Sequence, residues 1–323
     1  AGDKLSNIQD LTGSAFDDTF VASAAANNFD GGASTSSSHN RVSYTNSTVA
    51  ETVDLFLGTG SGGVGSLANG DTYTNIQDVT GGSGNDIFVA SAAANKFDGG
   101  GGTHNLVSYA NSAVSETVDL FLGTGSGGAG SLANGDTYIN IQDVTGGSAD
   151  DTFVASAAAN KFDGGGGTHN RVSYANSAVA VTVDLVAGTG TGGLADLDTY
   201  TNIQDVTGGA GDDTFVASAA ANKFDGSGGT HNRVSYATSA AAVTVNLFNG
   251  TGTGGLADLD TYTNIQDVTG GLADDIFVAS AAANGFDGGG STHNLVSYAN
   301  STVSETVDLF LGTGSGGAGS LAN

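Results

Sequence analysis

Aspartate in glycine-rich turns is the residue type in this chain with the clearest capacity for chemistry. Pairs of neighbouring Asp or Asn residues precede five short apolar runs, and a further Asp follows Phe in each FDG phrase. Carboxylates in such turns, together with exposed carbonyl groups, are the hard oxygen ligands that Ca²⁺ prefers. The same side chains could instead accept hydrogen bonds from backbone N–H groups of their own turn. The candidate metal ligands are Asp17, Asp18, Asn85, Asp86, Asp150, Asp151, Asp212, Asp213, Asp274 and Asp275, with the FDG residues Asp30, Asp98, Asp163, Asp225 and Asp287.

Histidine occurs five times, always followed by Asn, and we interpret it as a turn cap. The residues are His39, His104, His169, His231 and His293. They lie far apart along the chain, so no two of them fall within one repeating unit to share a metal ion. Ser and Tyr near these histidines do not suggest a catalytic triad, because a catalytic centre is unique whereas each polar residue here recurs in near-identical copies. The sequence therefore predicts no enzyme and no catalytic residue.

The phrase NIQD marks a tandem repeat that must position these turns. Its Asp stands at residues 10, 78, 143, 205 and 267, which gives steps of 68, 65, 62 and 62 residues. A fixed period of this kind indicates an array in which each unit packs on its neighbours. We predict a single array over residues 1–323, with repeats at about 1–68, 69–133, 134–195, 196–257 and 258–322.

The repeat is punctuated as short strands and tight turns. The chain contains 54 Gly residues, clustered between β-branched or aromatic runs. In the run 181–185, Val and Leu alternate with Thr and Asp, so the apolar side chains should point inward. The alanine-rich runs such as 88–95 are too short for a stable helix, and we expect a strand edge followed by a tight arc. The predicted fold class is all-β, a parallel β-solenoid with about three coils per repeat.

Two stretches vary in length between repeats and are predicted to be solvent loops. Residues 33–38 carry three extra residues, and residues 61–71 are three residues longer than the matching stretch 191–198. Insertions are tolerated where backbone polar groups face water. We therefore expect the variable stretches on the outside and the constant ones in the wall.

The charge balance restricts the partners. There are 33 acidic and 7 basic residues, so the net charge is −26, which should repel nucleic acid and anionic membranes and favour cations. Cys is absent, which excludes disulfides and thiolate metal sites. No apolar run is long enough for a membrane span, and residues 1–10 lack the pattern of a secretion signal, so we expect no membrane insertion and an export signal elsewhere.

The segment 81–89, GGSGNDIFV, fits the calcium-binding nonapeptide GGxGxDxUx at every position. Looser copies stand at 13–21, 146–154, 208–216 and 270–278. With DTYTNIQDVTG and TVDL, these motifs resemble the repeat-in-toxin (RTX) family, the haemolysin-type calcium-binding β-roll proteins, and in particular the long surface and adhesin arrays that bacteria secrete by type I machinery. The resemblance covers the whole chain. It implies an extracellular or cell-surface location and Ca²⁺-assisted folding. Because each repeat holds one good and one poor nonapeptide, it implies about one Ca²⁺ site per repeat.

The sequence favours a structural role. Near-identical repeats without a unique site are typical of the repetitive body of a secreted fibre or a biofilm-matrix or cell-surface polymer. Unpaired strand edges at the ends of an array either continue into more chain or stack on another copy end to end. The alternative is the calcium-binding stalk of a type I-secreted adhesin, which a longer chain with non-repeat domains would favour. A carbohydrate- or ice-binding module would need an exposed aromatic or Thr array, and the sequence offers only one Thr-x-Thr per repeat.

Overall fold

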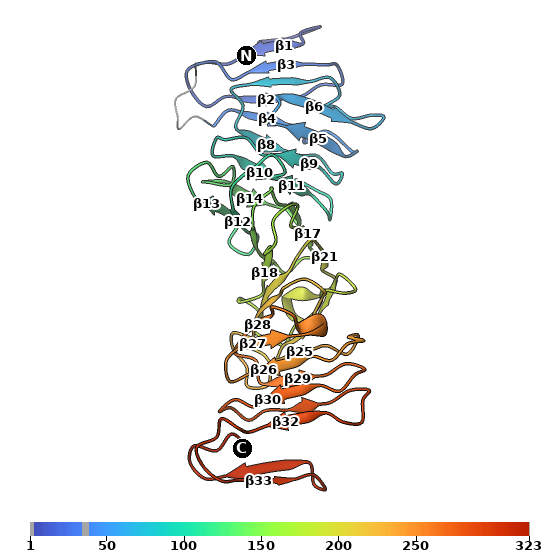
Figure 1. Cartoon of the computed structure of the whole chain (residues 1–323). Helices are drawn as coiled ribbons and strands as arrows, with labels where there is room; N and C mark the ends of the chain where they lie inside the picture. The colour runs from blue at the N-terminus through green and yellow to red at the C-terminus, as the bar shows by residue number, and fades with distance from the viewer. Residues whose placement is uncertain (1–2, 34–38, 323) are drawn as a thin grey trace. The chain divides into compact units, whose positions relative to one another are not determined.

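The computed structural model describes residues 3–33 and 39–322. Over these residues the chain is all-β apart from two single-turn 3₁₀ helices, η1 (Gly193–Ala195) and η2 (Gly255–Ala257) (Figure 1). It divides into two compact units, the first ending at residue 156 but including 160–168, and the second formed by 157–159 and residues from 169 onward. No helix in the described part has the length and apolar character needed to cross a membrane.

The first unit contains seventeen strands, nearly all of three or four residues. They are β1 (Asp10–Thr12), β2 (Thr19–Val21), β3 (Asn28–Asp30), β4 (Arg41–Ser43), β5 (Glu51–Asp54), β6 (Thr59–Gly62), β7 (Thr72–Thr74), β8 (Asp78–Thr80), β9 (Ile87–Val89), β10 (Lys96–Asp98), β11 (Leu106–Ser108), β12 (Glu116–Asp119), β13 (Thr124–Gly127), β14 (Thr137–Ile139), β15 (Asp143–Thr145), β16 (Thr152–Val154) and β17 (Lys161–Asp163).

The second unit repeats the same order of elements. Its strands are β18 (Arg171–Ser173), β19 (Thr182–Asp184), β20 (Thr189–Thr191), β21 (Thr199–Thr201), β22 (Asp205–Thr207), β23 (Thr214–Val216), β24 (Lys223–Asp225), β25 (Arg233–Ser235), β26 (Thr244–Asn246), β27 (Thr251–Thr253), β28 (Thr261–Thr263), β29 (Asp267–Thr269), β30 (Ile276–Val278), β31 (Phe286–Asp287), β32 (Leu295–Ser297), β33 (Glu305–Asp308) and β34 (Thr313–Gly316).

Two mixed, mostly parallel sheets face each other in each unit. In the first unit their strand orders are β1-β3-β7-β6-β5-β9-β11-β15-β17 and β2-β4-β8-β10-β14-β13-β12-β16. In the second unit they are β21-β20-β19-β23-β25-β29-β31 and β18-β22-β24-β28-β27-β26-β30-β32, and β33 and β34 form a separate pair. The chain passes back and forth between the sheets, which is consistent with the expected repetitive β-solenoid.

The number of coils per repeat differs from the prediction. From β8 the chain visits the two sheets alternately through β9, β10 and β11, and the three strands β12–β14 then lie together in the sheet of β8. One repeat therefore makes five visits, or two and a half turns, rather than about three. As a result β15, which begins the next repeat, lies in the sheet opposite to β8. The prediction missed this because one expected coil is replaced by an antiparallel excursion.

That excursion is a three-stranded antiparallel meander. Strand β13 pairs antiparallel with both β12 and β14, whereas β12 and β14 pair in parallel with β16 and β10 on either side. The same arrangement recurs at β5–β7 and β26–β28. The meander keeps three consecutive strands in one sheet, so the seven strands of a repeat make five visits; because five is odd, the next repeat begins in the opposite sheet.

The alternation of apolar and polar residues along the strands places the apolar side chains in the core, as expected. The central apolar residue of most short strands points inward, and in the run 181–185 Val181 and Val183 are buried while Leu185 is half-buried. Phenylalanines from facing strands stack in pairs, such as Phe88 on Phe97 with ring centroids 5.6 Å apart. The expected strand edge and arc at 88–95 is confirmed, because Ile87–Val89 is extended and no helix follows.

The variable loop at 61–71 is only partly a solvent loop. Its first residues are exposed, but Ser66, Ala68 and Asp71 are buried. In the other variable stretch, residues 34–38 lie outside the described residues. The first loop therefore contributes to the wall as well as to the surface.

Candidate functional site

In four of the five predicted pairs the second Asp lies in the core beside backbone amides, whereas Asp18 is half-buried and accepts a hydrogen bond from the backbone N–H of Ser14. Asp86 is fully buried, and its two carboxylate oxygens accept hydrogen bonds from the backbone N–H groups of Gly82 at 2.8 Å and Glu51 at 2.7 Å. Asn105 accepts a hydrogen bond from the Asp86 N–H through its side-chain oxygen at 2.8 Å. Burial raises the pKa of Asp86, and the two amide hydrogen bonds oppose that rise. Asp151, Asp213 and Asp275 accept the same two types of backbone hydrogen bond.

The first residue of each pair lies at the surface and caps the turn of the following coil. Asp212 accepts hydrogen bonds from the backbone N–H groups of Thr230 at 2.6 Å and His231 at 2.9 Å, and these lower its pKa. Asn85 makes the same two contacts with Thr103 and His104. Asp17, Asp150 and Asp274 also bond the glycine-rich segment that follows.

The FDG aspartates form Asx turns. Asp98 accepts hydrogen bonds from the backbone N–H of Gly100 at 2.9 Å and from the Asn140 side chain at 3.1 Å. Asp30, Asp163, Asp225 and Asp287 each accept a hydrogen bond from the backbone N–H two residues on.

The predicted metal ligands thus lie in three separate environments. Within the described residues no group of three or more His, Cys, Asp or Glu side chains is placed to hold a metal ion. The hydrogen bonds above are those of the backbone-capping role, and they already use both oxygens of the buried carboxylates. The buried carboxylates are therefore better suited to accepting hydrogen bonds from backbone N–H groups than to binding a cation.

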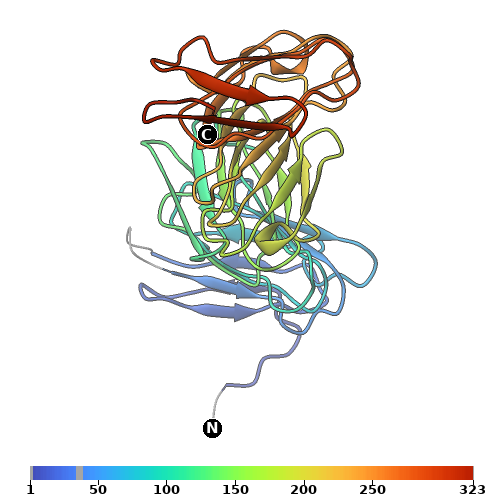
Figure 2. The ribbon, with the colours of Figure 1, turned by 90° about the horizontal axis from the view of Figure 1, so that it is seen from below.

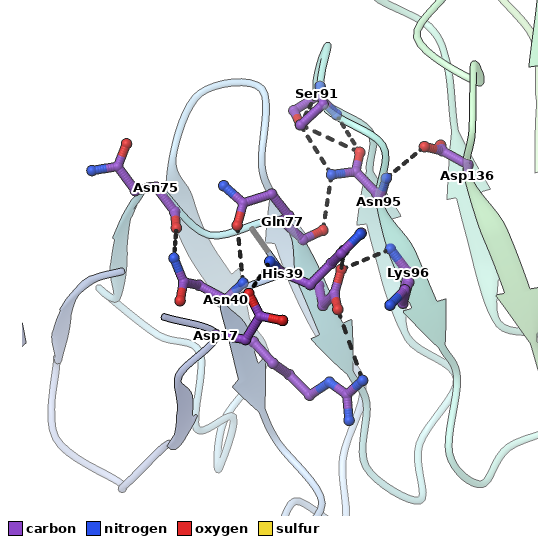
Figure 3. A network of polar contacts seen from close by, with 12 residues as sticks. Asp17, His39, Asn40, Asn75, Gln77, Ser91, Asn95, Lys96 and Asp136 are labelled. Atoms are coloured by element: carbon purple, nitrogen blue, oxygen red, sulfur yellow. Dashed lines mark hydrogen bonds and ion pairs between the residues drawn. The ribbon is translucent and has the colours of Figure 1, made fainter. Parts of the chain in front are cut away.

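Four of the five histidines pair with the Asp of the next NIQD phrase, a partner that the sequence did not reveal. The Nδ1 atom of His39 lies 2.9 Å from Oδ1 of Asp78, and His104, His169 and His231 make the equivalent contact at 3.1 to 3.3 Å. Asp78 is buried and also accepts a hydrogen bond from the backbone N–H of Lys96. Figure 3 shows His39, Asn40 and Gln77 meeting in this network. The histidine is a junction residue as well as a turn residue.

Positive charge gathers around these NIQD aspartates. Arg41 lies 3.8 Å from Asp78, Lys161 lies 3.9 Å from Asp143, and Arg233 lies 3.5 Å from Asp267. Lys223 lies 3.7 Å from Oδ2 of Asp205, a buried oxygen that has no hydrogen bond within the described structure. The scarce basic residues therefore compensate the buried NIQD carboxylates.

A buried Tyr–Asp–Tyr cluster joins one repeat to the next. The Tyr109 hydroxyl donates to Oδ2 of Asp136 at 2.6 Å and lies 2.5 Å from the Tyr138 hydroxyl, while the backbone N–H of Asn95 donates to Oδ1 of Asp136 at 2.7 Å. Burial raises the pKa of Asp136 to about 7. Equivalent clusters are Tyr44–Asp71–Tyr73, Tyr174–Asp198–Tyr200 and Tyr236–Asp260–Tyr262.

A glutamate anchors each long variable loop, and Glu51 and Glu116 are buried. Glu116 accepts hydrogen bonds from the hydroxyls of Ser112 and Ser131 and from the backbone N–H groups of Leu132 and Ala133. Glu51 and Glu305 make the corresponding contacts with their own loops. In the two repeats with the short loop, this position is occupied by the buried residues Val181 and Val243. The sequence could have indicated this link between Glu and loop length, because its three Glu residues occur only in repeats with the long loop.

The chain matches no known family model and no curated protein. The resemblance to RTX proteins therefore rests on the motifs in the sequence alone.

Proposed function

We propose that this chain is a non-enzymatic extracellular structural protein, the repetitive body of a secreted fibre or of a biofilm-matrix or bacterial cell-surface polymer. The observation that carries the proposal is the junction between successive repeats. Tyr109 and His104 of one repeat bond Asp136 and Asp143 of the next, and this double contact recurs at each junction for which all the partner residues are described. Each repeat is thus completed by its successor, as an extended load-bearing element requires.

The same repetition supports a non-enzymatic role. Each buried polar cluster occurs in several equivalent copies, and each is occupied by contacts within the chain. A catalytic centre brings a unique set of groups to a substrate. The polar residues here are better explained as junction residues.

Assembly of the purified chain tests the proposal. We expect light scattering and electron microscopy to show elongated particles that grow with protein concentration, in a buffer with or without millimolar Ca²⁺. A chain that stays dispersed at the mass of one copy, 31.4 kDa, under all of these conditions would count against a self-assembling fibre. It would favour the second candidate, the stalk of an adhesin, which the same junctions suit because a stalk must also resist extension.

Calcium stabilisation is a separate part of the proposal and rests on the nonapeptide match at residues 81–89. Exposed Asp residues and glycine carbonyls of these turns would supply the oxygen ligands. Circular dichroism during thermal unfolding, with Ca²⁺ and then with a chelator, tests it. A higher midpoint with Ca²⁺ than with equal ionic strength of NaCl supports binding, and identical curves would mean that the carboxylates act only as turn caps.

A further inference from the structure

The fifth repeat presents an open groove in the second unit. A cavity of about 220 Å³ is lined by Phe286, Val296, Tyr298, Val307 and Leu321, among others. In the second repeat the corresponding residues are Phe97, Val107, Tyr109, Val118 and Leu132, and all five are buried. The second repeat therefore shows which segment covers this groove when another repeat follows.

Within the array the occupant is the segment that leads into the next NIQD phrase. Strand β14 pairs with β10 so that Tyr138 lies opposite Phe97, and the Tyr138 N–H donates to the carbonyl of Gly123 at 2.9 Å. Asp136 of the same segment accepts the hydroxyl hydrogen bond of Tyr109. Further on, β15 pairs in parallel with β11, Leu106 opposite Asp143. Residues 136–145 therefore cover the groove of the preceding repeat.

The chain carries the same segment, uncovered, at residues 3–12. Its sequence DKLSNIQDLT follows the pattern of DTYINIQDVT at 136–145. Asn7 has a φ of 57°, the left-handed conformation that Asn140 also adopts with a φ of 53°. Figure 2 shows residues 3–9 running away from the first strands as an extended trace. The turn at this Asn therefore has the same left-handed conformation in the open segment as in the docked one.

The apolar side chains of this segment are exposed where their interior counterparts are buried. Ile8 is 50% exposed against 6% for Ile141, and Leu5 is 69% exposed against 7% for Tyr138. On the acceptor side, Val307 is 45% exposed against 0% for Val118. Both open edges also present unpaired parallel strand edges, which favour pairing with another strand. The two surfaces have complementary shapes, because copies of the same two surfaces are packed together in the interior of the chain.

We propose that residues 3–12 of one copy occupy the groove of the fifth repeat of a second copy and continue its two sheets. By analogy with the interior, β1 pairs with β32, Leu295 opposite Asp10, and β2 pairs with β33, Val307 opposite Phe20. These pairings copy those of β15 with β11 and of β16 with β12. Further repeats following in the same polypeptide would make these contacts too, so the test uses the 323-residue chain itself.

Side-chain chemistry agrees with this register. Asp10 would accept the His293 contact that Asp143 accepts from His104, and Asp3 would accept the Tyr298 hydroxyl as Asp136 accepts that of Tyr109. The segment departs from the interior sequences at Lys4, Leu5, Ser6 and Leu11, and the change that removes a cluster member is Leu5, which stands where the interior segments have Tyr. The junction between copies would thus lack the second Tyr hydroxyl but keep the apolar contact, which makes it weaker than an interior junction.

This inference rests on the proposed end-to-end assembly and specifies its interface, which two variants test together. Ile8→Asp blocks the donor edge and Val307→Asp blocks the acceptor edge. Both side chains are exposed in the single chain, so each variant should fold with the circular dichroism spectrum of the wild type. Each variant alone should remain at the mass of one copy, and a mixture of the two should form a dimer but nothing larger, because each variant retains one intact edge.

Matched substitutions control for surface polarity. Ile139→Asp and Val186→Asp place the same charge at exposed sites away from both edges and should assemble as the wild type does. Wild-type assembly that persists in both edge variants, or a mixture that yields no dimer, would overturn the proposed register while leaving the fibre proposal standing. Loss of assembly in the matched controls would also overturn it and would point to lateral association. A wild-type chain that never assembles would instead overturn the fibre proposal itself.

Discussion

Burial raises the pKa of the Asp136 and Asp260 carboxyl groups to about 7. Each accepts a hydrogen bond from a buried Tyr hydroxyl and from a backbone N–H, yet desolvation outweighs these contacts. Because a buried carboxylate is costly, the folded chain prefers to keep the proton. The Tyr–Asp–Tyr cluster therefore couples folding to pH.

The free energy of unfolding should fall as pH rises from about 4 to about 7. The pKa of Asp136 and Asp260 is about 7 in the folded chain, against the ordinary value of 3.8 that applies when the chain unfolds. Between these values the folded chain holds protons that the unfolded chain has released, so this stability is complete below pH 4 and lost above pH 7. The difference corresponds to about 4 kcal/mol per group. Urea unfolding at pH 5 and pH 8 measures the part of this difference that lies above pH 5.

The double variant Asp136→Asn with Asp260→Asn is the control for this pH effect. Its free energy of unfolding should differ less between pH 5 and pH 8 than that of the wild type. Glu305 does not interfere, because its pKa is lowered to about 2 by hydrogen bonds and its contribution is lost only in stronger acid. Greater stability at pH 8 than at pH 5 would contradict the prediction.

Replacing Tyr109 by Phe should destabilise the chain by about 1 to 3 kcal/mol, because Asp136 loses its hydroxyl donor while remaining buried. Tyr298→Phe is the matched control, since the described residues provide no hydrogen bond to the Tyr298 hydroxyl. Both should be measured by urea unfolding in the Ile8→Asp background, which prevents assembly. Equal losses for the two variants would argue against the role of the cluster.

At the scale of elements, the long loop and the buried glutamate act as one unit. Glu116 accepts two hydroxyl and two backbone hydrogen bonds from residues of its meander and loop. In the short form, Val181 fills the same place and the loop closes through η1. A buried Glu therefore accompanies the long loop, and a buried Val at the same position accompanies the short loop.

Exchanging only half of this unit should be harmful. Glu116→Val leaves the buried hydroxyl of Ser131 and the backbone N–H of Leu132 without their acceptor, at a cost of about 2 to 4 kcal/mol. Replacing loop 126–136 by the sequence of 191–198 in the same variant should recover most of that loss. Thermal unfolding of the single variant and the combined variant measures the effect. If the combined variant is no more stable than Glu116→Val alone, the proposed coupling is wrong.

For the whole molecule, the net charge of −26 opposes any association of copies. Added salt screens exposed charges, with a Debye length of about 8 Å at physiological ionic strength. We therefore expect assembly to become faster as NaCl rises from about 10 to 300 mM, followed by light scattering. Sodium sulfate at matched ionic strength tests whether screening is the cause. A rate that falls with NaCl would show that charge repulsion does not limit assembly.

The sequence by itself determined the tandem repeat, the all-β fold class and the inward orientation of Phe and Val, because these follow from local spacing and alternation. It also left open a capping role for the turn aspartates, and Asp86 makes the hydrogen bonds of that role. These properties depend on residues within one turn or strand, so a linear pattern encodes them.

Only the tertiary structure decided the two-and-a-half-turn repeat and the junction clusters. Tyr109 bonds Asp136, 27 residues away, and His104 contacts Asp143, 39 residues away. Which residues meet over such separations depends on how many times the chain crosses between the sheets. Because β13 returns antiparallel within the sheet of β12, the chain does not cross between the sheets there, and no local spacing reports this. The partners of Tyr, His and Glu therefore follow from the stacking of strands, which the sequence pattern alone does not specify.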